Sequence, residues 1–114
     1  MDALQVARHD GADRTVLALV GALDVATAPG FRQTLQEVQY GGGRSVVLDL
    51  RELEFLDSFG LGVIVGGLRR ARTHGGSLTV EVPDGSRVRH VFEVTGLDEP
   101  LGMTPPGGRS ASDH

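Results

Sequence analysis

The chain has 114 residues and a formal net charge of −4, because 15 acidic residues outweigh 11 basic residues, all of them arginines, and it has no cysteine. The absence of lysine excludes a P-loop, a Schiff-base mechanism and a phosphoacceptor aspartate with a lysine partner, and the absence of cysteine excludes metal sites built on cysteine pairs. The length and the 39% of hydrophobic residues fit one domain with a single core.

Extended runs and helical patterns alternate along the chain. The first two extended runs are separated by a short connection that contains Asp10-Gly11, which favours a hairpin. Pro29 fits the first turn of a helix, and three glycines at 41–43 end that helix. In chain order, the predicted elements are strands at 4–8 and 15–20, a helix at 29–40, a strand at 45–50, a loop at 51–57, a helix at 58–73, a strand at 77–82, a helix that begins at 84–86 and ends at Gly96, and a short final edge strand at 101–103.

This order predicts an α/β fold, with a mainly parallel sheet of four to five strands, an N-terminal hairpin and three main helices. Strand–helix–strand crossovers return the chain in the same direction, so the strands that they join are parallel. Functional residues in such sheets gather at the carboxyl ends of the strands. We therefore expect the segments 21–24, 57–58 and 83–86 to meet at one edge.

The densest local signal is the segment 55–62, Phe-Leu-Asp-Ser-Phe-Gly-Leu-Gly, where a loop enters the second helix. Asp57 or Ser58 should cap the free backbone N–H groups at the start of that helix. Glycines inside the helix each cost roughly 0.5 to 1 kcal/mol relative to alanine. Something must therefore approach this helix closely, either the sheet or the surface of another protein. The buried stripe of the helix is expected to consist of Leu61, Ile64, Val65 and Leu68.

The same segment does not indicate an enzyme. A serine hydrolase would need the nucleophile elbow Gly-x-Ser-x-Gly, but Leu56 stands two residues before Ser58. The four histidines are not placed as a base for that serine, and they lack the spacing of metal ligands. We expect no catalytic residue and no metal site.

The charge distribution bears on partners and location. An acidic chain with scattered aromatic residues lacks the basic footprint of a nucleic-acid binder. Charged residues stand where a signal peptide would have its apolar region, and no uncharged stretch approaches the roughly 20 residues that span a bilayer. The sequence therefore predicts a soluble cytoplasmic protein without a membrane span, and the lack of disulfides fits a reducing compartment.

Three segments resemble a known family. The segment 57–63, Asp-Ser-Phe-Gly-Leu-Gly-Val, follows the strand at 46–50 and is similar to the signature of STAS-domain anti-sigma factor antagonists. The segment 21–29 resembles the first strand-to-helix passage of that family, and the segment 92–97 resembles its third helix and exit. The three motifs stand in the right order and spacing, so together they imply the STAS fold.

The resemblance also implies the domain organisation. It covers residues 3 to 104, which places a STAS domain at 1–104. The remaining tail at 105–114 has no apolar side chain larger than alanine apart from its prolines, and we expect it to be disordered.

A phosphorylation switch is what the resemblance implies for function. In this family the unphosphorylated antagonist binds an anti-sigma factor that is also a serine kinase, and so frees a sigma factor. The kinase phosphorylates the serine of the motif, here Ser58, and a PP2C-type phosphatase restores it. This chain would then hold no cofactor, because ATP and Mg²⁺ would belong to the kinase. By the same resemblance, the partner-binding residues are Asp24, Asp57, Ser58, Phe59, Gly60 and Leu61.

Two alternatives stay open at this point. Many relatives have a small residue after the phosphoserine, whereas Phe59 is large, so its ring either folds back against the domain or anchors a partner. STAS domains also serve as scaffold parts of stress-sensing assemblies or as accessory subunits of transport systems, and some of these have no phosphorylatable residue. The presence of Ser58 favours the switch.

Overall fold

The computed structural model describes residues 3–103 and confirms the predicted α/β architecture. Four strands form one sheet in the order β1-β2-β3-β4, in which the first pair is antiparallel and the other two pairs are parallel. The elements are β1 (Leu4–Asp10), β2 (Thr15–Leu23), α1 (Ala28–Tyr40), β3 (Ser45–Leu56), α2 (Ser58–Thr73), β4 (Ser77–Glu81) and α3 (Arg87–Val94).

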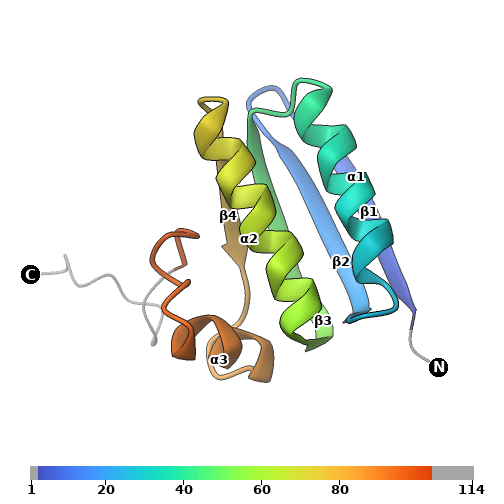
Figure 1. Ribbon diagram of the computed structural model, residues 1–114, viewed down its shortest axis with the longest axis vertical. Helices are drawn as coiled ribbons and strands as arrows, with labels where there is room; N and C mark the ends of the chain where they lie inside the picture. Colours follow the sequence, from blue (N-terminus) through green and yellow to red (C-terminus); the bar gives the residue numbers. More distant parts are fainter. Residues whose placement is uncertain (1–2, 104–114) are drawn as a thin grey trace, which may run out of the picture.

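The helices are placed unevenly around the sheet (Figure 1). α1 and α2 lie side by side across one face, and α3 lies at the end of the sheet where α2 begins (Figure 1). The core fills the space between the sheet and these helices. Its largest fully buried side chains include Phe31, Phe92, Leu17, Leu19, Leu23 and Leu35.

The contact face of α2 is centred on small residues. Of the predicted stripe, Ile64 and Leu68 are buried, but Leu61 and Val65 are only half-buried. Gly60, Val63, Gly67 and Ala71 complete the buried face instead. A Cβ atom on Gly67 would lie 2.6 Å from Leu35 Cδ2 of α1, so the glycine lets the two helices approach closely. The prediction of a close approach to this helix is therefore correct at Gly67.

The predicted loop at 51–57 is wrong, because β3 continues to Leu56. β2 likewise extends three residues beyond its predicted end, to Leu23, and the two strands stay paired there. Their register shifts twice, between Ala18 and Val20 and again between Gly21 and Ala22. Such irregularities break the alternation of inward and outward residues, which is the pattern by which a strand is predicted from sequence.

The predicted final strand at 101–103 is also wrong. Backbone bonds from Gly102 N to the Glu99 carbonyl and from Met103 N to the Asp98 carbonyl fold this segment into turns, and Gly102 adopts φ +69°. Leu101 nevertheless covers the edge of β4, because its carbonyl accepts a bond of 3.0 Å from Val80 N. The proposed domain end at 104 and the tail at 105–114 lie outside the described residues.

Candidate functional site

The carboxyl ends of β2 and β3 meet where α1 and α2 begin (Figure 1). The backbone N–H of Asp57 donates a bond of 3.2 Å to the carbonyl of Leu23, the last residue of β2. The β2–α1 loop, which begins at Asp24, therefore lies directly beside the start of α2, as the sequence predicts. The third predicted segment, 83–86, follows β4 and leads into α3.

Asp57 holds this junction together. Its Oδ1 accepts bonds from the backbone N–H groups of Phe59 at 2.9 Å and Gly60 at 3.0 Å, which makes it the N-cap of α2. Its Oδ2 accepts a bond of 3.0 Å from the backbone N–H of Val25 in the β2–α1 loop. One carboxylate thus caps the helix and ties the neighbouring loop to it.

Asp24 shapes the β2–α1 loop in the same way. Its Oδ1 accepts bonds of 3.0 Å from the backbone N–H groups of Ala26 and Thr27, and its own N–H donates to Thr27 Oγ1 at 2.9 Å. The Thr27 hydroxyl in turn donates to the Ala22 carbonyl at 2.8 Å. Among the described residues, the second carboxylate oxygen of Asp24 has no hydrogen-bond partner, so it is free to accept one from another molecule.

Ser58 is exposed as the first residue of α2. Because Asp57 already caps the helix, the Ser58 hydroxyl is not needed for capping. In the part of the chain that the structure describes, that hydroxyl makes no hydrogen bond. The sequence left open which of the two residues caps the helix, and the structure assigns the cap to Asp57 and leaves the serine accessible.

Large apolar side chains lie exposed on both sides of this junction. Phe59 is 60% exposed and Val25 is 58% exposed, and their backbone N–H groups both bond to the carboxylate of Asp57. The alternative in which the Phe59 ring folds back against the domain is therefore wrong. Exposed aromatic and aliphatic side chains beside a polar group are typical of a protein-binding surface. We call Val25, Ser58 and Phe59 the Ser58 surface.

Val25 was not predicted as a site residue from the sequence. Two predicted partner residues, Gly60 and Leu61, are less exposed than a partner-binding role would suggest. Gly60 is buried, because the space around it is filled by Leu23 and Leu56, so it supports the surface from below and does not belong to it. Leu61 is half-buried and packs against the core. The only sequence signal for Val25 is an apolar residue next to Asp24 in a turn.

Replacing Asp57 by asparagine tests its double role. Both carboxylate oxygens accept backbone N–H groups, but an asparagine amide accepts with its oxygen alone. Asp57→Asn should therefore lose either the helix cap or the bond to Val25, which lowers the free energy of unfolding by roughly 1 to 2 kcal/mol. Urea denaturation measures this loss. Asp13→Asn, at an exposed position, is the charge-matched control, and an equally small loss in both variants would contradict the double role.

Comparison with known proteins defines the family. The family model described as "Mlab, STAS domain" matches residues 6–105. The chain therefore belongs to the STAS-domain family, as its motifs and its fold predict. No helix in residues 3–103 is long and apolar enough to cross a membrane, and the same residues contain no group of three or more potential metal-binding side chains.

Named relatives and solved structures point to one class within the family. The anti-sigma-B factor antagonist of Listeria monocytogenes is 32% identical over 87 residues, which cover 76% of this chain and 75% of that protein. The crystal structure of an anti-sigma factor antagonist from Mycobacterium paratuberculosis has a TM-score of 0.81 at 25% identity, covering 92% of this chain and 88% of that one. Unphosphorylated SpoIIAA, also an anti-sigma factor antagonist, has a TM-score of 0.72 at 26% identity, covering 85% and 84%.

Proposed function

We propose that this chain is an anti-sigma factor antagonist, which binds an anti-sigma factor and thereby releases a sigma factor. The names of its relatives support this class. The observation that points to particular residues is the exposed Ser58 at the start of α2. Its neighbour Asp57 caps that helix, and the exposed side chains of Val25 and Phe59 flank the serine. The free oxygen of Asp24 adds a hydrogen-bond acceptor beside that surface.

Phosphorylation of Ser58 is proposed to end this interaction. The kinase would be the anti-sigma factor itself, which would bring ATP and Mg²⁺, and a PP2C-type phosphatase would restore the hydroxyl. A phosphate adds about −1.5 to −2 charges. It gains only about 0.3 to 1 kcal/mol from the helix dipole, and the neighbouring Asp57 opposes even that gain. Forcing the same charge into a desolvated interface costs several kcal/mol, so the phosphate should expel the partner.

The switch needs no refolding of the domain. Asp57 caps α2 whether or not Ser58 carries a phosphate, because the serine takes no part in the cap. A third solved structure, the Bacillus cell fate determinant SpoIIAA in the phosphorylated form, has a TM-score of 0.67 with this chain at 25% identity, covering 87% of each. SpoIIAA is thus a relative that has a phosphorylated form, which supports a phosphorylation switch in this chain. Because sigma factors act on transcription inside the cell, the proposal places the chain in the cytoplasm.

A capture experiment tests the proposed function. Tagged Ser58→Ala and Ser58→Glu variants are used to capture partners from a lysate of the native organism, and the captured proteins are identified by mass spectrometry. An anti-sigma factor with a kinase domain held by Ser58→Ala and lost by Ser58→Glu is the expected result. Equal capture by both variants would favour the alternative, a scaffold or accessory subunit that does not switch.

The exposed ring of Phe59 is expected to anchor the partner. Truncating an aromatic anchor in an interface typically costs about 2 kcal/mol, which is roughly a 30-fold weaker dissociation constant. Titration of Phe59→Ala against the anti-sigma factor measures this loss. Tyr40→Ala is the matched control, because Tyr40 is 66% exposed at the far end of α1. An unchanged affinity for Phe59→Ala would show that the ring is not an anchor.

A further inference from the structure

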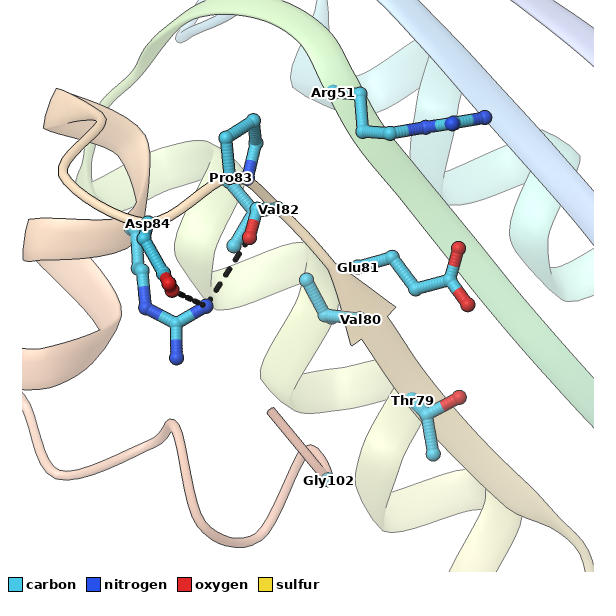
Figure 2. Close-up of a pocket in the computed structure, with 9 residues that line it drawn as sticks. Arg51, Thr79, Val80, Glu81, Val82, Pro83, Asp84 and Gly102 are labelled. Carbon is cyan, nitrogen blue, oxygen red and sulfur yellow. Dashed lines mark hydrogen bonds and ion pairs between the residues drawn. The ribbon is translucent and has the colours of Figure 1, made fainter. Parts of the chain in front are cut away.

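A cavity of about 570 Å³ lies along the outer side of β4, separate from the Ser58 surface. The consecutive residues 79–84 form most of its wall, and Arg51, Arg89 and Gly102 complete it. Figure 2 shows Val82 and Asp84 on one side of the opening, and Thr79 and Gly102 on the other. Its volume falls within the range of about 300 to 1,000 Å³ that is usual for small-molecule sites.

Arg89 brings a buried charge to this cavity. The side chain, on α3, is only 3% exposed. Its Nη1 donates to the Val82 carbonyl at 3.1 Å and lies 3.4 Å from Asp84 Oδ1. Its Nε donates to Glu93 at 3.1 Å. Its Nη2 is buried and has no hydrogen-bond partner within residues 3–103.

Because almost all buried polar groups in folded proteins are hydrogen-bonded, we expect Arg89 Nη2 to bind an acceptor. The charges around the cavity decide which acceptor fits. The two carboxylates of Asp84 and Glu93 more than balance the single positive charge of Arg89.

Arg51 is also engaged, because it donates two bonds to Asp49, at 2.9 Å and 2.7 Å, and thereby holds the pKa of that carboxyl below its ordinary value. Glu81 adds a further negative charge to the wall. An anionic ligand would therefore meet net repulsion, whereas an uncharged oxygen would not.

We propose that this cavity binds a small uncharged ligand, which places a carbonyl oxygen on Arg89 Nη2 and an apolar group against Val82 and Pro83. Amides and related neutral carbonyl compounds have this chemistry. No residue of the Ser58 surface lines the cavity, so the inference goes beyond the proposed function, and either can fail without the other.

Two probes of nearly the same shape and different charge test the proposal by NMR. Benzamide and benzoate are each titrated into the ¹⁵N-labelled full chain, and the backbone amides of Thr79, Val82, Asp84 and Gly102 are followed. Benzamide should shift these signals with a dissociation constant of about 1 mM, typical of a fragment. Benzoate should bind at least about tenfold more weakly. No local shift with benzamide, as when water alone satisfies Arg89, or equal or tighter binding of benzoate, would overturn the proposal.

Variants locate the binding to Arg89. Arg89→Met keeps an unbranched apolar side chain, shorter than that of arginine, and removes the donors, so benzamide binding should be lost, whereas Arg51→Gln at the exposed rim should change it less than about twofold. If Arg89→Met does not fold, Thr79→Met replaces it as the test. This substitution narrows the cavity, leaves Arg89 in place and should also abolish binding. Benzamide binding that survives Thr79→Met, or Arg89→Met when that variant folds, would overturn the assignment.

Discussion

Phosphorylation of Ser58 is expected to weaken binding to the anti-sigma factor by at least about a hundredfold. The physical reason is desolvation: the Ser58 surface combines one hydroxyl with exposed Val25 and Phe59, and a partner that covers it would bury the phosphate as well. A cost of several kcal/mol corresponds to two or more powers of ten in the dissociation constant. Isothermal titration calorimetry of the unmodified chain and of fully phosphorylated chain measures the difference.

Two controls separate this effect from unfolding. Ser58→Ala cannot be phosphorylated and should bind like the unmodified chain, both before and after treatment with the kinase. The melting temperature of the phosphorylated chain should stay close to that of the unmodified chain, because Asp57 carries the helix cap. A phosphorylated form that binds as tightly as Ser58→Ala would refute the charge switch, and a large fall in melting temperature would show that the domain refolds.

Replacing Gly60 by alanine is expected to destabilise the domain by about 2 to 3 kcal/mol, the upper part of the usual range for overpacking a filled core. A Cβ at this position would lie 2.6 Å from Leu23 Cγ, 2.7 Å from the Leu23 carbonyl oxygen and 2.9 Å from Leu56 Cδ1. The carbonyl oxygen cannot easily move, because it accepts the bond from Asp57 N that joins β2 to the start of α2. The strain therefore falls on the junction that supports the Ser58 surface.

Gly62 offers a matched control on the same helix. It is exposed, and a Cβ there would meet nothing within 4 Å, so Gly62→Ala should stabilise the chain by about 0.5 to 1 kcal/mol through helix propensity alone. Guanidinium denaturation of both variants measures the two changes. Equal effects of the two substitutions would contradict the close packing at Gly60.

Local signals in the sequence were sufficient to predict the order of the elements from β1 to α3 and the start of each helix. Pro29 lies in the first turn of α1, and Ser86 caps α3 through its hydroxyl, which accepts a bond from Arg89 N. A start signal of this kind depends on residues within one helical turn of each other. The extended end of β3 could not be predicted, because it depends on pairing with β2 across two register shifts.

The residues of the functional site could likewise be predicted only where a local signal marks them. Asp57 and Ser58 could be predicted from their place before a helical pattern. Val25 could not, because its position depends on a hydrogen bond to a carboxylate 32 residues away. Gly60 and Gly62 stand in similar sequence contexts. Only the packing of α2 on Leu23 and Leu56 leaves no room for a side chain at Gly60.

Arg89 is buried, although its sequence context favours an exposed side chain. It stands in a polar stretch with arginine at 87 and histidine at 90, where a charged side chain would ordinarily be exposed. The fold buries it because its guanidinium bridges the Val82 carbonyl and two carboxylates, those of Asp84 and Glu93. A contact between a helix and the end of the preceding strand is a tertiary feature, so no local pattern in the sequence announces it.

Release of a sigma factor from its anti-sigma factor is the most direct test of the proposed function. A fluorescently labelled sigma factor is bound to the anti-sigma factor of the same organism, and the fluorescence anisotropy is followed as this chain is added. The unphosphorylated chain is expected to free the sigma factor at near-stoichiometric amounts, and chain phosphorylated on Ser58 is expected to leave the complex intact. A complex that survives an excess of unphosphorylated chain, or that is disrupted equally by both forms, would contradict an antagonist that phosphorylation switches off.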